Sequence, residues 1–130
     1  ESGISSIKEI EASGLADCLT CSNTAKWLTL PDLIDWHGLF GTDISPLAKY
    51  EGGGLSGPPL KPLVESWVKK VRIAGVMMPI KAGGGVLGPI DAIDFLRAGA
   101  SAVELGCISM LAPYNVTATI RAINNYRGPN

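Results

Sequence analysis

Apolar residues recur along the chain with two periods, that of a helix and that of a short buried strand. The clearest helical period covers residues 60–73, where Leu60, Leu63 and Val64 begin one apolar stripe with spacings of three and four positions. Two prolines fall in its first turn, where a missing backbone N–H costs little. Further helices are predicted over residues 5–13, 89–98 and 115–126, the last with Asn115 as its N-cap.

Short apolar runs between these helices predict buried strands at residues 17–22, 78–82 and 102–105. Regular alternation of strands and helices is typical of an α/β fold with a parallel sheet. Residues 23–58 are rich in Gly and Pro and are predicted to form a long loop with one short helix near residues 33–36. Three strands complete no common parallel sheet, and a (β/α)8 barrel takes about 250 residues. We therefore expect part of a larger barrel domain.

Composition narrows the class of protein. The chain is 46% hydrophobic and 18% charged, which is typical of a globular protein. Its 11 basic and 12 acidic residues exclude a basic nucleic-acid surface, and its apolar runs are far shorter than the roughly 20 residues of a membrane-spanning helix. Three cysteines and the lack of a secretory leader pattern lead us to expect a reducing, cytoplasmic compartment.

Glycines directly follow the second and third predicted strands. Gly84 and Gly85 follow the second, and Gly106 with Cys107 follows the third. Such turns let backbone N–H groups converge on an anion, and barrels place a phosphate site after strands 7 and 8. Each turn by itself is equally well explained as a tight turn, but two in succession favour phosphate binding.

Two more motifs lie around the long loop. Asn23 and Thr24 follow the first strand, where an amide beside a hydroxyl suits a heterocycle that carries carbonyl and N–H groups, although Asn in this place is also a common turn former. The run GGGLSGPPLKP at residues 52–62 leads into the long helix. It either covers a ligand at the same sheet edge or is a plain flexible loop.

Taken together and in this order, these motifs resemble the C-terminal half of the dihydroorotate dehydrogenase family, together with the related flavin domain of dihydropyrimidine dehydrogenase. The resemblance rests on CSNT at 21–24, the run at 52–62 and PIKAGGGVLGPIDAIDFLRAGASAVELG at 79–106. It implies that residues 1–130 are a partial FMN-binding domain, about strands 6–8 with their helices of a (β/α)8 TIM barrel, whose N-terminal half is absent from this chain.

The activity implied is that of an FMN-dependent oxidoreductase acting on a CH–CH group, oxidising dihydroorotate to orotate in pyrimidine biosynthesis. Two alternatives stay open. One is reduction of a pyrimidine in the manner of dihydropyrimidine dehydrogenase. The other is a non-catalytic phosphate- or flavin-binding half-barrel, closed by forming a homodimer.

The resemblance also implies roles for individual residues. The family's catalytic base lies upstream of Glu1, so no residue of this chain is expected to be catalytic, and the chain alone is expected to be inactive. The Thr or Ser usual in the family is replaced by Cys107, which keeps a backbone N–H but loses a hydroxyl. The pyrimidine substrate is expected to contact Asn23 and Thr24, and the FMN cofactor Thr24, Gly57, Gly84, Gly85, Gly106 and Cys107.

The remaining candidates have simpler explanations. Cys18 and Cys21 form a CxxC pair, but residues three apart on a strand face opposite sides, so buried thiols are favoured over a metal or redox site. Lys61 either meets a ligand phosphate or is solvated. A loop position explains His37 better than a role as a base. The motifs assign no role to Trp27, Trp36 and His37.

Overall fold

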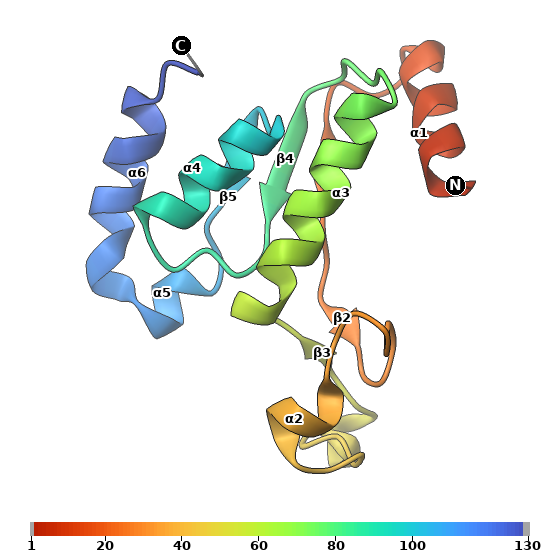
Figure 1. Ribbon diagram of the computed structural model, residues 1–130, viewed down its shortest axis with the longest axis vertical. Helices are drawn as coiled ribbons and strands as arrows, with labels where there is room; N and C mark the ends of the chain where they lie inside the picture. Colours follow the sequence, from red (N-terminus) through yellow and green to blue (C-terminus); the bar gives the residue numbers. More distant parts are fainter. Residues whose placement is uncertain (1, 129–130) are drawn as a thin grey trace.

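The computed structural model describes residues 2–128, which form an α/β body and a smaller lobe (Figure 1). The body contains a parallel three-stranded sheet in the order β1 (Leu19–Cys21), β4 (Ile80–Gly83) and β5 (Ala102–Glu104). The predicted α/β class with a parallel sheet is confirmed. Each strand is followed by helical crossover structure, which is what parallel strands require.

Three helices pack together over one face of this sheet (Figure 1). They are α3 (Lys61–Ile73), α4 (Pro89–Ala98) and α6 (Val116–Asn125). The predicted stripe of the long helix is confirmed as its core-facing side, because Val64, Val68 and Val71 are buried against the sheet. Phe95 of α4 and Ile80 of β4 are fully buried in the same core.

Helix α1 (Ser2–Ser13) lies beside the C-terminal end of α3 (Figure 1). It ends at Gly14, which adopts a left-handed conformation with φ of 65°. The carboxylate of Glu11 accepts the backbone N–H of Met77 at 2.7 Å and so fastens α1 to the turn that precedes β4. Among the helices of residues 2–128, none combines the length and apolar character needed to cross a bilayer.

The opposite face of the sheet carries polar and small side chains. Thr20, Lys81 and Ala102 lie side by side in register, and Thr20 and Ala102 are exposed. Glu104 lies two positions beyond Ala102 and points the same way, because side chains alternate along a strand. Its carboxylate lies 3.2 Å from the Lys81 ammonium.

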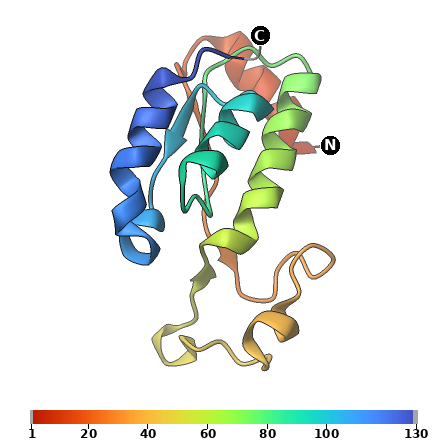
Figure 2. The same cartoon turned by 60° about the vertical axis from the view of Figure 1, so that its left-hand side comes forward.

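The lobe comprises residues 23–57 and projects from the end of the body at which α3 begins (Figures 1 and 2). A short antiparallel ribbon of β2 (Ala25–Lys26) and β3 (Gly54–Leu55) closes its base. Its interior is aromatic, because the Trp27 ring lies 5.1 Å from that of Trp36 and 4.9 Å from that of Phe40. The two tryptophans that motifs could not place are therefore the packing core of the lobe.

Two local predictions were wrong, and a third was confirmed only in part. The short helix of the lobe is α2 (Trp36–Phe40) rather than residues 33–36, because the Asp35 carboxylate caps it by accepting the Gly38 N–H at 2.8 Å. Residues 23–58 are not all loop, since they include the β2–β3 ribbon. Asn115 is the N-cap residue of α6, as predicted, but its side chain makes no capping hydrogen bond and donates to the Leu87 carbonyl at 2.9 Å instead. The short helix α5 (Ile108–Leu111) was not predicted.

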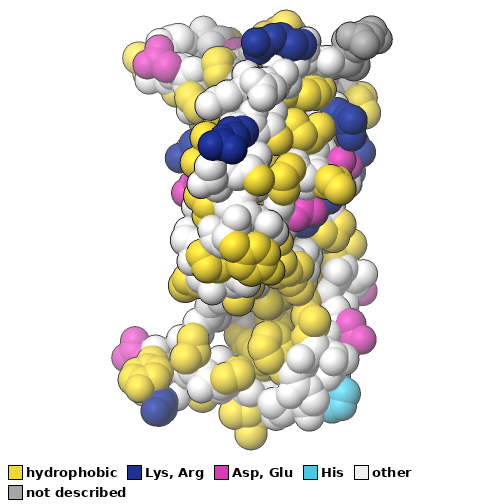
Figure 3. Space-filling view, turned by 90° about the vertical axis from the view of Figure 1, so that its left-hand side faces the viewer, with side chains coloured by type: hydrophobic (Ala, Val, Ile, Leu, Met, Phe, Trp, Pro, Cys, Tyr) yellow, Lys and Arg dark blue, Asp and Glu magenta, His cyan; other side chains and the backbone are white. Residues whose placement is uncertain are grey.

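Many large apolar side chains are exposed. After β5, Met110, Leu111 and Tyr114 are exposed, as are Leu28, Leu30 and Ile44 in the lobe. Figure 3 shows hydrophobic side chains gathered over the narrow middle of one face, between body and lobe. An exposed hydrophobic surface of this kind is typical of a region that packs against another protein segment.

Candidate functional site

The three parallel strands end at one edge of the sheet, and a cavity of about 160 Å³ lies there. Segments distant in the sequence meet around it: the residues after β1, the glycine turn after β4 and the turn after β5. Within the described chain, Glu104 is the one charged residue of its lining. The lining consists of Ser22, Asn23, Thr24, Ser56, Leu60, Gly83, Gly84, Gly85, Val86, Glu104, Gly106 and Cys107.

Two glycine turns bring backbone N–H groups to the lining of this cavity. Apart from ladder bonds of the sheet, the N–H groups of Gly84, Gly85, Gly106 and Cys107 make no hydrogen bond to another protein group among residues 2–128. Gly84 and Gly85 have φ values of 125° and 75°, in the left-handed region where L side chains are rare. Unpaired N–H groups converging from two adjacent turns are typical of an anion-binding concavity.

The four residues of these turns differ in the space around them. A Cβ at Gly85 would lie 2.7 Å from the Gly57 carbonyl oxygen and 2.9 Å from Cα of Pro58. A Cβ at Gly106 would meet no atom within 4 Å among the described residues. Gly85 is therefore required by close packing against the chain itself, whereas Gly106 borders open space in the cavity.

Gly57 lies on the far side of Gly85 rather than in the cavity lining. It is buried and its φ of 90° is left-handed. Its carbonyl packs against Gly85, and Ser56 and Leu60 are the residues of this run that line the cavity. The glycine run at 52–62 thus covers the glycine turn after β4 directly.

Asn23 and Thr24 both line the cavity, next to the glycine turns. The amide oxygen of Asn23 accepts the N–H of Thr24 at 2.7 Å, so this side chain also shapes the turn, as its residue type favours. The Thr24 side chain packs against Gly54 of β3, where a Cβ would overlap it. Both residues are exposed, which leaves them accessible to a ligand.

Three polar residues of the lining lie within the quoted motifs but were assigned no role: Ser22, Ser56 and Glu104. The Ser22 hydroxyl donates to the Gly83 carbonyl at 2.7 Å and joins the ends of β1 and β4. Strand alternation could have found Glu104, because it is two positions beyond the exposed Ala102 on the same strand face.

The three thiols lie in different environments. Cys18 is exposed, contrary to the predicted burial, whereas Cys21 and Cys107 are buried. Burial raises the pKa of the Cys21 thiol to about 11. The Cys107 thiol donates to the Val86 carbonyl at 3.4 Å and links the two glycine turns. Within residues 2–128, no three His, Cys, Asp or Glu side chains are grouped as metal ligands.

We expect alkylation at pH 8 to modify Cys18 rapidly and Cys21 very slowly. Raising the pKa of Cys21 from 9.0 to about 11 lowers its thiolate fraction roughly a hundredfold, and burial blocks access as well. Mass spectrometry of iodoacetamide-treated protein measures both rates, with the protein in 6 M guanidinium chloride as the control in which all sites react. Equal rates at Cys18 and Cys21 in native protein would contradict this assignment.

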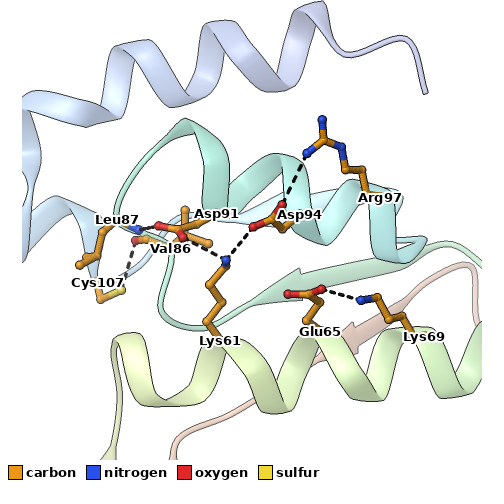
Figure 4. A network of polar contacts seen from close by, with 9 residues as sticks. All are labelled: Lys61, Glu65, Lys69, Val86, Leu87, Asp91, Asp94, Arg97 and Cys107. Atoms are coloured by element: carbon orange, nitrogen blue, oxygen red, sulfur yellow. Dashed lines mark hydrogen bonds and ion pairs between the residues drawn. The ribbon is translucent and has the colours of Figure 1, made fainter. Parts of the chain in front are cut away.

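Lys61 forms ion pairs with two carboxylates while 22% of its side chain stays exposed. Its ammonium lies 2.8 Å from an Asp94 carboxylate oxygen and 3.1 Å from one of Asp91 (Figure 4). The hydrogen bond that Lys61 donates to Asp94, followed by the one that it donates to Asp91, raises the pKa of Lys61. His37 is exposed in the lobe, 3.8 Å from Asp43 and away from the cavity lining.

A second, larger hollow of about 790 Å³ runs along the free edge of β1. Its walls are mostly apolar and include Leu19, Leu63, Val64 and Trp67. Since β1 is paired on one side only, its other edge presents unpaired backbone groups to this groove.

Comparison with known proteins gives relatives that are all described as dihydroorotate dehydrogenases. The family model described as dihydroorotate dehydrogenase matches residues 38–125, a range that excludes Asn23 and Thr24. The catalytic subunit of dihydroorotate dehydrogenase B (NAD(+)) from Caldicellulosiruptor saccharolyticus is 40% identical over 85 residues, which cover 62% of this chain and 27% of that protein. The corresponding subunit from Alkaliphilus oremlandii is 32% identical over 120 residues, covering 92% of this chain and 36% of that protein.

Solved structures agree with these relatives. A crystal structure of DHODH from Eimeria tenella in complex with ferulenol aligns with a TM-score of 0.63 and 27% identity. The alignment covers 94% of this chain and 31% of that one. The chain therefore corresponds to about a third of the length of the relatives that it matches.

Proposed function

Because this chain belongs to the dihydroorotate dehydrogenase family, we propose that it forms the C-terminal, FMN-binding part of an enzyme that oxidises dihydroorotate to orotate in pyrimidine biosynthesis. The observation that supports this most directly is the set of unpaired N–H groups at the ends of β4 and β5. Barrels hold phosphate in these two turns, and FMN carries a phosphate.

The backbone donors of the lining fit the phosphate end of FMN, and among the described residues Glu104 is the one carboxylate beside them. The cavity of about 160 Å³ is smaller than the roughly 300 Å³ at which small-molecule pockets begin, so it suits a phosphate rather than a whole flavin. Gly84, Gly85, Gly106 and Cys107 would supply backbone donors there. FMN, when bound, supplies the flavin ring that takes up a hydride from the substrate.

Asn23 and Thr24 would orient the pyrimidine beside this site. The Asn23 amide and the Thr24 hydroxyl provide both donors and acceptors for the carbonyl and N–H groups of the ring. They lie at the carboxyl end of β1, one strand away from the proposed phosphate turn. Their part is to bind and position the substrate, which raises the rate by fixing its distance from the flavin.

We propose that residues 1–130 are a partial barrel domain that the remainder of a barrel completes. The free edge of β1, the apolar groove beside it and the exposed inner face of the sheet support this. A parallel strand added to that edge would pair its backbone groups and cover the groove. By resemblance to the family, the remainder of the barrel would also supply the catalytic base.

FMN and riboflavin binding test this proposal, because the two flavins differ by one phosphate. We expect the chain to bind FMN at least about tenfold more tightly than riboflavin, since hydrogen bonds to a charged phosphate are worth more than those to a hydroxyl. Quenching of flavin fluorescence measures both affinities. Equal affinities would contradict the phosphate site.

Turnover is tested separately. We expect the chain with added FMN to show no dihydroorotate-dependent dye reduction until it is joined to the N-terminal part of the Caldicellulosiruptor relative. Joining that part to a chain of unrelated sequence is the control. Sustained turnover by the chain alone would place the base within residues 1–130 and overturn the partial-site proposal.

A further inference from the structure

The loop that leaves β4 is held at two successive residues. The Leu87 N–H donates to a carboxylate oxygen of Asp91 at 2.9 Å, and the Leu87 carbonyl accepts from the Asn115 amide at 2.9 Å. One residue earlier, the Val86 carbonyl accepts from the Cys107 thiol at 3.4 Å. The loop that carries Gly84 and Gly85 is therefore tied to α4, to the start of α6 and to the turn after β5.

Asp91 is itself held by Lys61, which belongs to the glycine run at 52–62 that covers the turn after β4. Its second carboxylate oxygen lies 3.1 Å from the ammonium of Lys61, the first residue of α3, and Figure 4 shows Lys61 reaching across from α3 to Asp91 and Asp94 of α4. The base of the same lysine packs over the glycine turn, since a Cβ at Gly85 would lie 3.0 Å from Cβ of Lys61. One side chain thus contacts the turn and fastens the residue that clamps it.

The charges of Asp91 and Lys61 affect how the glycine turn can bind an anion. Asp91 brings a carboxylate to the neighbourhood of a site that we propose for a phosphate, and like charges repel. Both Asp91 and Lys61 are less than one-third exposed, so this interaction is only partly screened by solvent. Lys61 stays protonated because its two carboxylate partners favour the charged form, and it offsets the negative charge next to the turn.

We infer that Asp91 is a positioning residue of the anion site: it clamps the glycine turn through the Leu87 N–H, and Lys61 holds and neutralises it. The phosphate part of this inference rests on the proposed function, whereas the clamp does not. The clamp keeps the N–H groups of Gly84 and Gly85 in the arrangement that an anion needs before it arrives.

Amide hydrogen exchange of the chain tests the clamp directly. In Asp91→Ala we expect the Leu87 amide to exchange at least about tenfold faster, because its acceptor is lost. In Asp91→Asn it should stay within about threefold of the parent, because an amide oxygen still accepts. Asp94→Ala is the matched control: Asp94 binds the same lysine at 2.8 Å but makes no hydrogen bond to the loop among the described residues. Unchanged exchange in Asp91→Ala would overturn the clamp.

Flavin affinities test whether the clamp serves an anion. We expect Asp91→Ala to lower FMN affinity about tenfold and to leave riboflavin affinity within about twofold, with rescue by Asp91→Asn. Lys61→Met should weaken FMN selectively, and Lys61→Arg should restore it. An equal loss of both flavins would reduce Asp91 to a structural residue and overturn the inference.

The two proposals fail in distinguishable ways. If the parent chain, alone and joined to the N-terminal part of the relative, binds FMN no better than riboflavin, the proposed phosphate site fails while the exchange result still decides the clamp. If the parent selects FMN and Asp91→Ala selects it equally well, the positioning role fails and the proposed function stands.

Discussion

Replacing Gly106 with valine is expected to abolish FMN binding while leaving the fold intact. The backbone at Gly106 is not in the left-handed region, and a Cβ there meets no described atom within 4 Å. The valine side chain would therefore extend into the cavity and displace the phosphate from the N–H groups of the two turns. Loss of one or two charge-assisted hydrogen bonds corresponds to a fall of at least about a hundredfold in FMN affinity.

Fluorescence titration with FMN, together with circular dichroism, measures this effect. Gly3→Val is the matched control, because Gly3 is exposed on α1 and a Cβ there also meets no described atom within 4 Å. Gly106→Val with the FMN affinity of the parent would remove the turn after β5 from the site. Gly85→Val is the less informative variant, because its side chain would collide with Gly57 and Pro58 and disturb the turn itself.

Truncating Phe95 to alanine is expected to lower the free energy of unfolding by about 3–5 kcal/mol. Phe95 is fully buried between α4 and the sheet, and the chain has a single helical layer over that face, so neighbouring side chains are unable to fill the cavity without moving helices. Since domains are typically stable by about 5–15 kcal/mol, this loss is a large part of the total.

Urea denaturation followed by circular dichroism measures the change. Ile90→Ala is the control, because Ile90 lies on the same helix but its side chain is 74% exposed, and we expect a change below about 0.5 kcal/mol. Comparable losses in the two variants would show that α4 does not pack on the sheet through Phe95.

Helices with long apolar stripes were predictable from the chain because periodicity is a local property. Residues 60–73 and 89–98 were located to within one residue of α3 and α4. The strands were predicted from apolar runs but with uncertain ends, and Gly83 belongs to β4 rather than to the turn after it. Strands β2 and β3 have two residues each, which is too short for any alternation to appear.

Most of the predicted site residues line one cavity, and one does not. Asn23, Thr24, Gly84, Gly85, Gly106 and Cys107 meet at one cavity, because the carboxyl ends of parallel strands share an edge. Gly57 does not line that cavity, because the segment that contains it packs behind the glycine turn. Their proposed roles toward FMN and substrate remain predictions, which the binding experiments above address.

The sequence by itself determined the order of the three parallel strands and the four longest helices, the glycine turns and the family, since all three depend on residues that are near one another in the chain. The tertiary structure decided which partners distant residues have. The Lys61–Asp91 pair joins residues 30 positions apart, and the Ser22–Gly83 hydrogen bond spans 61. Such contacts form only when α3, α4 and the sheet pack together, because a side chain's partner depends on three-dimensional distance rather than on residue type.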